Sequence, residues 1–115
     1  TFLWRCCDEL IFACVPYPLR PDVALLAEAI QKPPEKLVQS KLKEVQSVTK
    51  MPLFICLPFG VPKGAVVVAD VGLRGLPDYQ ELLFDCGTLA LRMSEAEFWR
   101  SLKPKEAKIC RRAEA

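Results

Sequence analysis

The sequence contains no histidine, and this absence excludes several kinds of active site. Without an imidazole base, neither a Ser-His-Asp triad nor a Cys-His pair can activate a nucleophile. The sequence also lacks any Cys-x-x-Cys spacing and any glycine-rich phosphate loop of the nucleotide-binding kinds. We therefore expect neither a bound metal nor a cofactor.

Long hydrophobic runs are missing as well. No apolar stretch approaches the roughly 20 residues that span a bilayer, and the candidate at 53–59 is interrupted by Pro58. The apolar N-terminus reaches Arg5 and Asp8 too soon for a secretion signal. The sequence therefore predicts a cytoplasmic protein. Because Thr1 enters directly into an expected strand, we also expect further residues ahead of it.

Six cysteines are present, but their placement argues against a disulfide framework. Cys6 and Cys7 are adjacent, so their side chains point to opposite faces if the segment is a strand. Cys14, Cys56 and Cys86 lie in apolar segments, where a free cysteine behaves as a small hydrophobic residue. These thiols are predicted to be reduced and structural.

The 115 residues are 51% hydrophobic and 26% charged, which is the balance of one globular domain. We predict this domain over residues 1–104, followed by a charged, frayed tail over 105–115. The formal net charge of +2 is too small to indicate nucleic-acid binding by itself. It remains compatible with a single basic face.

Apolar and β-branched runs, bounded by Pro, Gly and Asp, predict the secondary structure. Strands are expected at 2–7, 10–15, 36–39, 53–57, 65–70, 79–84 and 88–93. Helices are expected at 22–30, at 40–49 with Ser40 as its cap, and at 94–102 with a Ser94/Glu97 capping box. Because strands and helices do not alternate regularly, the predicted fold class is α+β. Its sheet is mixed, largely antiparallel and barrel-like, with flanking helices.

An ordered set of segments carries a family likeness. It begins with the strand pair at 1–16 and the helix at 22–30, continues through 44–49, 57–60 and 66–70, and ends with 84–88 and 92–97. Taken in this order, the segments resemble the YbaK/prolyl-tRNA synthetase-associated domain family. These segments are spread over about nine tenths of the chain.

This resemblance implies an aminoacyl-tRNA editing domain, a deacylase that hydrolyses mischarged tRNA in trans, with tRNA as its partner. The catalytic lysine of the family would immediately precede Thr1 and so lies outside this sequence. In such sites, backbone groups, a bound water and the ribose hydroxyl of the tRNA carry the chemistry. The residues that would border the substrate pocket are Lys50, Phe54, Ile55, Pro58, Phe59, Gly60, Asp70, Gly87 and Thr88.

The chain departs from the family pattern at its substrate loop. Phe54 and Ile55 stand where the family carries glycines ahead of the matched proline, Pro58, and Lys50 replaces another glycine. Glycine lets backbone approach a ligand closely, whereas Phe and Ile fill that space. This observation favours an alternative hypothesis, a catalytically inactive module of the same fold that binds tRNA or a protein partner.

Two further interpretations remain open from the sequence alone. Asp70 ends a strand, where it either positions a substrate group or accepts backbone hydrogen bonds in a turn. Four lysines (Lys41, Lys43, Lys50 and Lys63) form either an edge that faces tRNA or an ordinary solvated surface.

Overall fold

The computed structural model describes residues 1–16, 19–50, 56–59, 61–74, 81–85 and 90–111. Its strands are β1 (Phe2–Cys6), β2 (Glu9–Cys14), β3 (Leu37–Gln39), β4 (Val66–Asp70), β5 (Glu81–Asp85), β6 (Ala90–Ser94) and β7 (Lys105–Ala107). Its α-helices are α1 (Val23–Ile30), α2 (Leu42–Thr49) and α3 (Glu95–Leu102), and two 3-10 turns cover Pro34–Lys36 and Val71–Leu73. The expected strand at 53–57 lies mostly outside the described residues.

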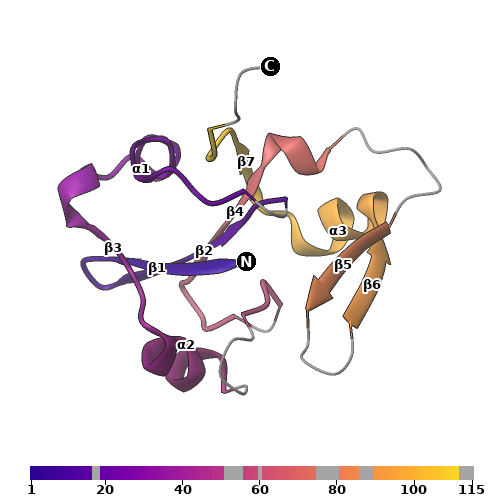
Figure 1. Ribbon diagram of the computed structural model, residues 1–115, viewed down its shortest axis with the longest axis horizontal. Helices are drawn as coiled ribbons and strands as arrows, with labels where there is room; N and C mark the ends of the chain where they lie inside the picture. The colour runs from indigo at the N-terminus through magenta and orange to yellow at the C-terminus, as the bar shows by residue number, and fades with distance from the viewer. Residues whose placement is uncertain (17–18, 51–55, 60, 75–80, 86–89, 112–115) are drawn as a thin grey trace.

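Five strands form one mixed sheet in the order β3-β1-β2-β4-β7 (Figure 1). β1 pairs antiparallel with β2 and β3, whereas β4 pairs parallel with β2 and β7. β5 and β6 form a separate antiparallel pair. The α+β class and the mixed sheet are confirmed. The barrel-like closure is not, because the five-stranded sheet is open, with β3 and β7 as its edges among the described strands.

Alternating side chains along β2 and β4 divide the core between the two faces of the sheet. One face packs against α1 and holds Trp4, Cys6, Ile11, Ala13, Leu26, Val68 and Ile109. On the opposite face, α2 covers Leu3 and Phe12 through Val45. Beside it on the same face, α3 covers Cys14 and Ala69 through Phe98, which is fully buried. The sheet is therefore sandwiched between α1 on one side and α2 with α3 on the other (Figure 1).

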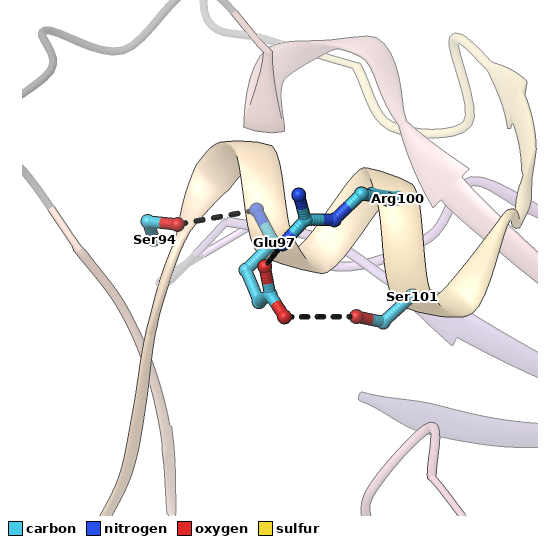
Figure 2. Close-up of polar contacts among 4 residues, drawn as sticks. All are labelled: Ser94, Glu97, Arg100 and Ser101. Atoms are coloured by element: carbon cyan, nitrogen blue, oxygen red, sulfur yellow. Dashed lines mark hydrogen bonds and ion pairs between the residues drawn. The ribbon is translucent and has the colours of Figure 1, made fainter.

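The start of α3 shows how the sequence sets a helix boundary. The hydroxyl of Ser94 accepts a hydrogen bond from the backbone N–H of Glu97 at 3.1 Å, as the predicted cap requires. The carboxylate of Glu97 turns toward Arg100 and Ser101 on the next turn of the helix (Figure 2). The helix ends at Lys103, which adopts a left-handed conformation with φ of 48°.

The expectation that Ser40 caps α2 is wrong. Lys41 occupies the N-cap position, and no side chain of the described residues caps this helix. The backbone N–H of Ser40 instead donates to the carbonyl of Leu3 at 2.9 Å, which continues the pairing of β3 with β1. Ser40 therefore belongs to the sheet edge, and this shifts the helix start by one residue.

Residues 105–111 are part of the fold, which corrects the expectation of a frayed tail beginning at Lys105. β7 pairs with β4, and the side chains of Ile109 and Cys110 are fully buried. The frequent charges along 105–112 obscured these two apolar anchors, since the sequence pattern there is mostly polar. Residues 112–115 lie outside the described part of the chain.

The structure describes five of the six cysteines, and none of these five forms a disulfide. Cys6, at the end of β1, is buried, whereas Cys7 is exposed in the turn that follows, so the expected strand does not extend to Cys7. Cys86 lies outside the described residues. Over the same described ranges, none of the helices combines the length and apolar character needed to cross a membrane.

Candidate functional site

The start of β1 and the end of β2 meet at one end of the sheet. Phe2 pairs with Ala13, which brings Thr1 beside Cys14. The Thr1 hydroxyl donates a long hydrogen bond to the Cys14 sulfur at 3.8 Å, and Cys14 is only 2% exposed. The position at which the resemblance implies a lysine, just before Thr1, is therefore adjacent to this sheet end.

The segment 56–59 lies along the sheet face that α2 and α3 cover. Cys56 packs against the cluster formed by Leu3, Phe12 and Val45, whereas Phe59 packs against the cluster that contains Cys14. Between them Leu57 is 8% exposed and Pro58 is fully buried. This part of the predicted substrate loop thus runs from the α2 side to the α3 side, past the end of β2.

The thiols of Cys14 and Cys56, which lie at this end of the sheet and in the segment 56–59, are neutral at physiological pH. Burial raises the pKa of Cys14 to about 11, although the hydrogen bond from Thr1 opposes part of that effect. Burial also raises the pKa of Cys56, whose proximity raises the pKa of Cys14 further. Because the thiolate is the nucleophilic form of cysteine, these groups can pack against a small molecule but are poorly suited to attack it.

Lys50 ends α2 in the left-handed conformation, with φ of 60°, and its backbone N–H donates to the carbonyl of Gln46 at 2.8 Å. Glycine is the usual residue at such a helix end. Lys50, which replaces a glycine of the family pattern, therefore adopts a backbone conformation that glycine favours. Its side chain is exposed, so it can reach a ligand only from the solvent side of the loop.

Asp70 does not join Pro58 and Phe59. Its side chain is fully buried, its Oδ2 accepts from the backbone N–H of Gly72 at 2.8 Å, and its Oδ1 accepts from that of Ile109 at 3.0 Å. Ile109 packs in the cluster with α1, on the opposite face of the sheet from Phe59. Of the two interpretations of Asp70, the structure shows the acceptor of backbone hydrogen bonds.

The remaining predicted pocket residues, Phe54, Ile55, Gly60, Gly87 and Thr88, lie outside the described residues. Their assignment to the pocket stays a prediction. The sequence interpretation did not single out Thr1, Cys14 or Cys56 as site residues. The signal that could have found them is the matched strand pair at 1–16, whose register places Thr1 next to Cys14. Within the described ranges, no three Cys, Asp or Glu side chains gather as metal ligands.

The chain matches no known family profile, and no curated protein matches its sequence. Solved structures do match its fold. A hypothetical protein, APE2540, superposes with a TM-score of 0.80 at 18% identity, over 96% of this chain and 72% of its own. A proposed trans-editing enzyme for prolyl tRNA synthetase gives the same TM-score, identity and coverage of this chain, with 68% of its own length matched.

A third match is a scaffold protein used for epitope backbone grafting by computational design, with a TM-score of 0.80 at 17% identity. It covers 96% of this chain and 71% of its own. At these identities the matches establish the fold alone. They confirm at that level the resemblance to YbaK-like editing domains.

Proposed function

We propose that this chain is an aminoacyl-tRNA editing-type domain that hydrolyses the ester of a small mischarged amino acid in trans. The observation that carries the proposal is the likeness of fold, over 96% of the chain, to a proposed trans-editing enzyme for prolyl tRNA synthetase. The meeting of β1 with the segment 56–59 supports it, because the resemblance assigns catalysis to those two places.

In this proposal, the partly exposed Thr1 and Cys56 form walls around the aminoacyl group, and the buried Cys14 and Pro58 support them from beneath. The walls are small and uncharged, since burial keeps both thiols protonated. A charged amino acid would lose its hydration there without a partner, at a cost of several kcal/mol. In this proposal the site accepts an alanyl or cysteinyl group and excludes larger side chains by size, in the manner of a second sieve.

The reaction needs no side-chain nucleophile. Water adds to the ester carbonyl, the bond from the carbonyl carbon to the ribose oxygen breaks, and the ribose oxygen leaves with a proton. The protein's contribution is to hold the ester and to offer backbone N–H groups to the developing oxyanion. Such a contribution is compatible with a chain that lacks histidine.

The test is hydrolysis of alanyl- and cysteinyl-tRNA made on the proline tRNA, with the protein as its gene encodes it. We expect release of the amino acid faster than in buffer. Cys56→Leu, which adds volume at a half-buried wall, should lower kcat/KM at least tenfold, whereas Cys7→Leu at an exposed turn should not. Thermal unfolding must show that both variants fold. No release by the folded wild type would refute the proposal.

A second candidate is a catalytically inactive module of the same fold that binds tRNA or a protein partner. The observation that favours it is the presence of Phe54 and Ile55 where the family pattern carries glycines. The two candidates differ in one measurement. Binding of tRNA with steep salt dependence, but without release of the amino acid, supports the inactive module.

A further inference from the structure

The positive charge of this chain is concentrated in one part of the sequence. Residues 41–69 hold four lysines and a single acid, Glu44, which is a surplus of three positive charges. The whole chain has a formal net charge of only +2, so the remainder is slightly acidic. Glu44 is already occupied by an ion pair with Arg5 on β1, and it therefore does not neutralise the lysines.

The four lysines, Lys41, Lys43, Lys50 and Lys63, are all exposed. We call them the lysine rim. Across the described residues, no ion pair joins any of them to an acid. Their charges are thus available to an external anion, which distinguishes them from Arg5, Arg74 and Arg111, each of which is paired with an acid.

The fold places the lysine rim on one side of the sheet. Lys41 and Lys50 occupy the N-cap and C-cap positions at the two ends of α2. Lys43 and Lys50 are seven positions apart, which is about two helical turns or 10 Å along the helix. Val61 and Ala65, on either side of Lys63, pack against the same cluster as Val45 of α2. Figure 1 shows α2 and the chain after Cys56 on this common side of the sheet.

The lysine rim also borders the candidate site. Cys56, a proposed wall of that site, packs in the cluster that supports α2 and the segment around Lys63. When the ester of a ligand occupies the site, the rest of the ligand must therefore extend past these lysines. The exposed lysines of the rim, which are not paired with acids, attract a ligand that carries several negative charges. The phosphates of RNA provide such charges at regular spacing.

We infer that the lysine rim binds the phosphate backbone of the tRNA acceptor end and positions the aminoacyl ester at the loop 56–59. This inference rests on the proposed function for the identity of the RNA. The binding surface itself depends only on the charge distribution and the packing described above, so the two can fail separately.

The test compares two double variants that remove equal charge. Lys43→Gln/Lys63→Gln neutralises two lysines of the rim, and Lys105→Gln/Lys108→Gln neutralises two exposed lysines of the C-terminal segment. The probe is proline tRNA that carries no amino acid, and its binding is measured by fluorescence anisotropy at a series of KCl concentrations. Glutamine removes the charge but keeps a polar, flexible side chain of similar size at these exposed positions, so a loss of binding reports the charge.

We expect the rim variant to bind about tenfold more weakly at 0.1 M salt. The slope of log affinity against log salt should fall by about 0.7 to 0.9 for each lysine that contacts a phosphate. The control variant should stay within twofold of the wild type. Equal losses in both variants, a shallow slope for the wild type, or binding to anionic phospholipid vesicles without binding to tRNA would overturn the inference.

Hydrolysis of alanyl-adenosine separates this inference from the proposed function. The small ester has no phosphates to contact the rim, so the rim variant should hydrolyse it as fast as the wild type while its KM for alanyl-tRNA rises. If neither ester is hydrolysed but tRNA binding depends on the rim, the proposed activity fails and the binding surface stands. If alanyl-tRNA is hydrolysed with unchanged KM by the rim variant, the surface is refuted and the activity stands.

Discussion

The backbone N–H of Ile109 donates to Oδ1 of Asp70 at 3.0 Å, across 39 positions of sequence. The other carboxylate oxygen of Asp70 accepts from Gly72 in the turn that follows β4. One buried side chain thus satisfies the backbone at the end of a central strand and at the C-terminal segment. Buried polar groups are tolerated when they are paired in this way, and they become costly when one partner is removed.

Asp70→Asn should destabilise the fold by about 1–3 kcal/mol, because the amide presents an NH2 group to one of the two backbone donors and leaves that donor unsatisfied. The free energy of unfolding in urea at pH 7 measures the effect. Asp8→Asn, at an exposed turn, is the matched control and should change stability by less than about 0.5 kcal/mol. Equal stabilities of the two variants would contradict the structural role of Asp70.

Asp22 predicts a pH dependence of stability. Its hydrogen bond from the Leu25 N–H and its pairing with Arg111 lower the pKa of its carboxyl group. Because the unfolded chain then binds the proton more readily, the stabilisation is present above the unfolded pKa of about 3.9. It is lost as the pH falls through the folded pKa.

Asp22→Asn separates the charge from the helix cap. Asparagine caps a helix about as well as aspartate, so the variant should lose only the pH-dependent part and should match the wild type in strong acid. Asp22→Ala should cost about 1 kcal/mol more at all pH values, since it removes the cap. Urea midpoints between pH 2 and pH 7 check this. Identical pH profiles for the wild type and Asp22→Asn would refute the assignment.

Cys14 should react slowly with thiol reagents. With its pKa at about 11, roughly one Cys14 thiol in a thousand is ionised at pH 8, and the side chain is buried. Cys7 is exposed at the turn between β1 and β2 and provides the internal comparison. In a time course with iodoacetamide, followed by peptide mass spectrometry, Cys7 should be alkylated at least a hundredfold faster. Comparable rates would show that Cys14 is neither buried nor neutral.

Two turn positions should respond to substitution in opposite directions. Cys7 has a φ of 56°, in the left-handed region that favours glycine, and Gly64 has a φ of 87°. Cys7→Gly should stabilise the protein by about 0.5–1 kcal/mol by relieving this strain. Gly64→Ala should destabilise it by about 1 kcal/mol through backbone strain alone, because no atom lies within 4 Å of the added methyl group. Thermal and urea unfolding measure whether the free energy of unfolding rises for Cys7→Gly and falls for Gly64→Ala.

Most of the fold could be predicted because its strands and helices are marked in the local sequence by apolar or β-branched runs and by capping residues. The strand 66–70 is a β-branched run, and the helix at 95–102 begins with a capping serine that the structure confirms. The resemblance, carried by ordered segments rather than by any single motif, led to the fold that the solved structures share. The separation of the core into an α1 face and an α2–α3 face follows from the alternation along β2.

The C-terminal segment could not be predicted, because its place depends on tertiary contacts that leave little trace in local sequence. β7 is only three residues long and mostly polar, and it is held by pairing with β4. The role of Asp70 was ambiguous for the same reason, since one of its donors, Ile109, is distant in sequence. The candidate site was found only in part. The loop 56–59 follows from the family pattern, but the burial that keeps Cys14 neutral becomes visible only in the folded structure.

The position of β7 has a consequence for the synthesis of this protein on the ribosome. A nascent chain that has emerged only as far as Pro104 has made β4 but exposes one edge of that strand, and the Asp70 carboxylate lacks its donor from Ile109. The sheet can be completed only when β7 and Ile109 have also left the exit tunnel. A chain cut before β7 should therefore be prone to aggregation rather than behave as a slightly shortened domain.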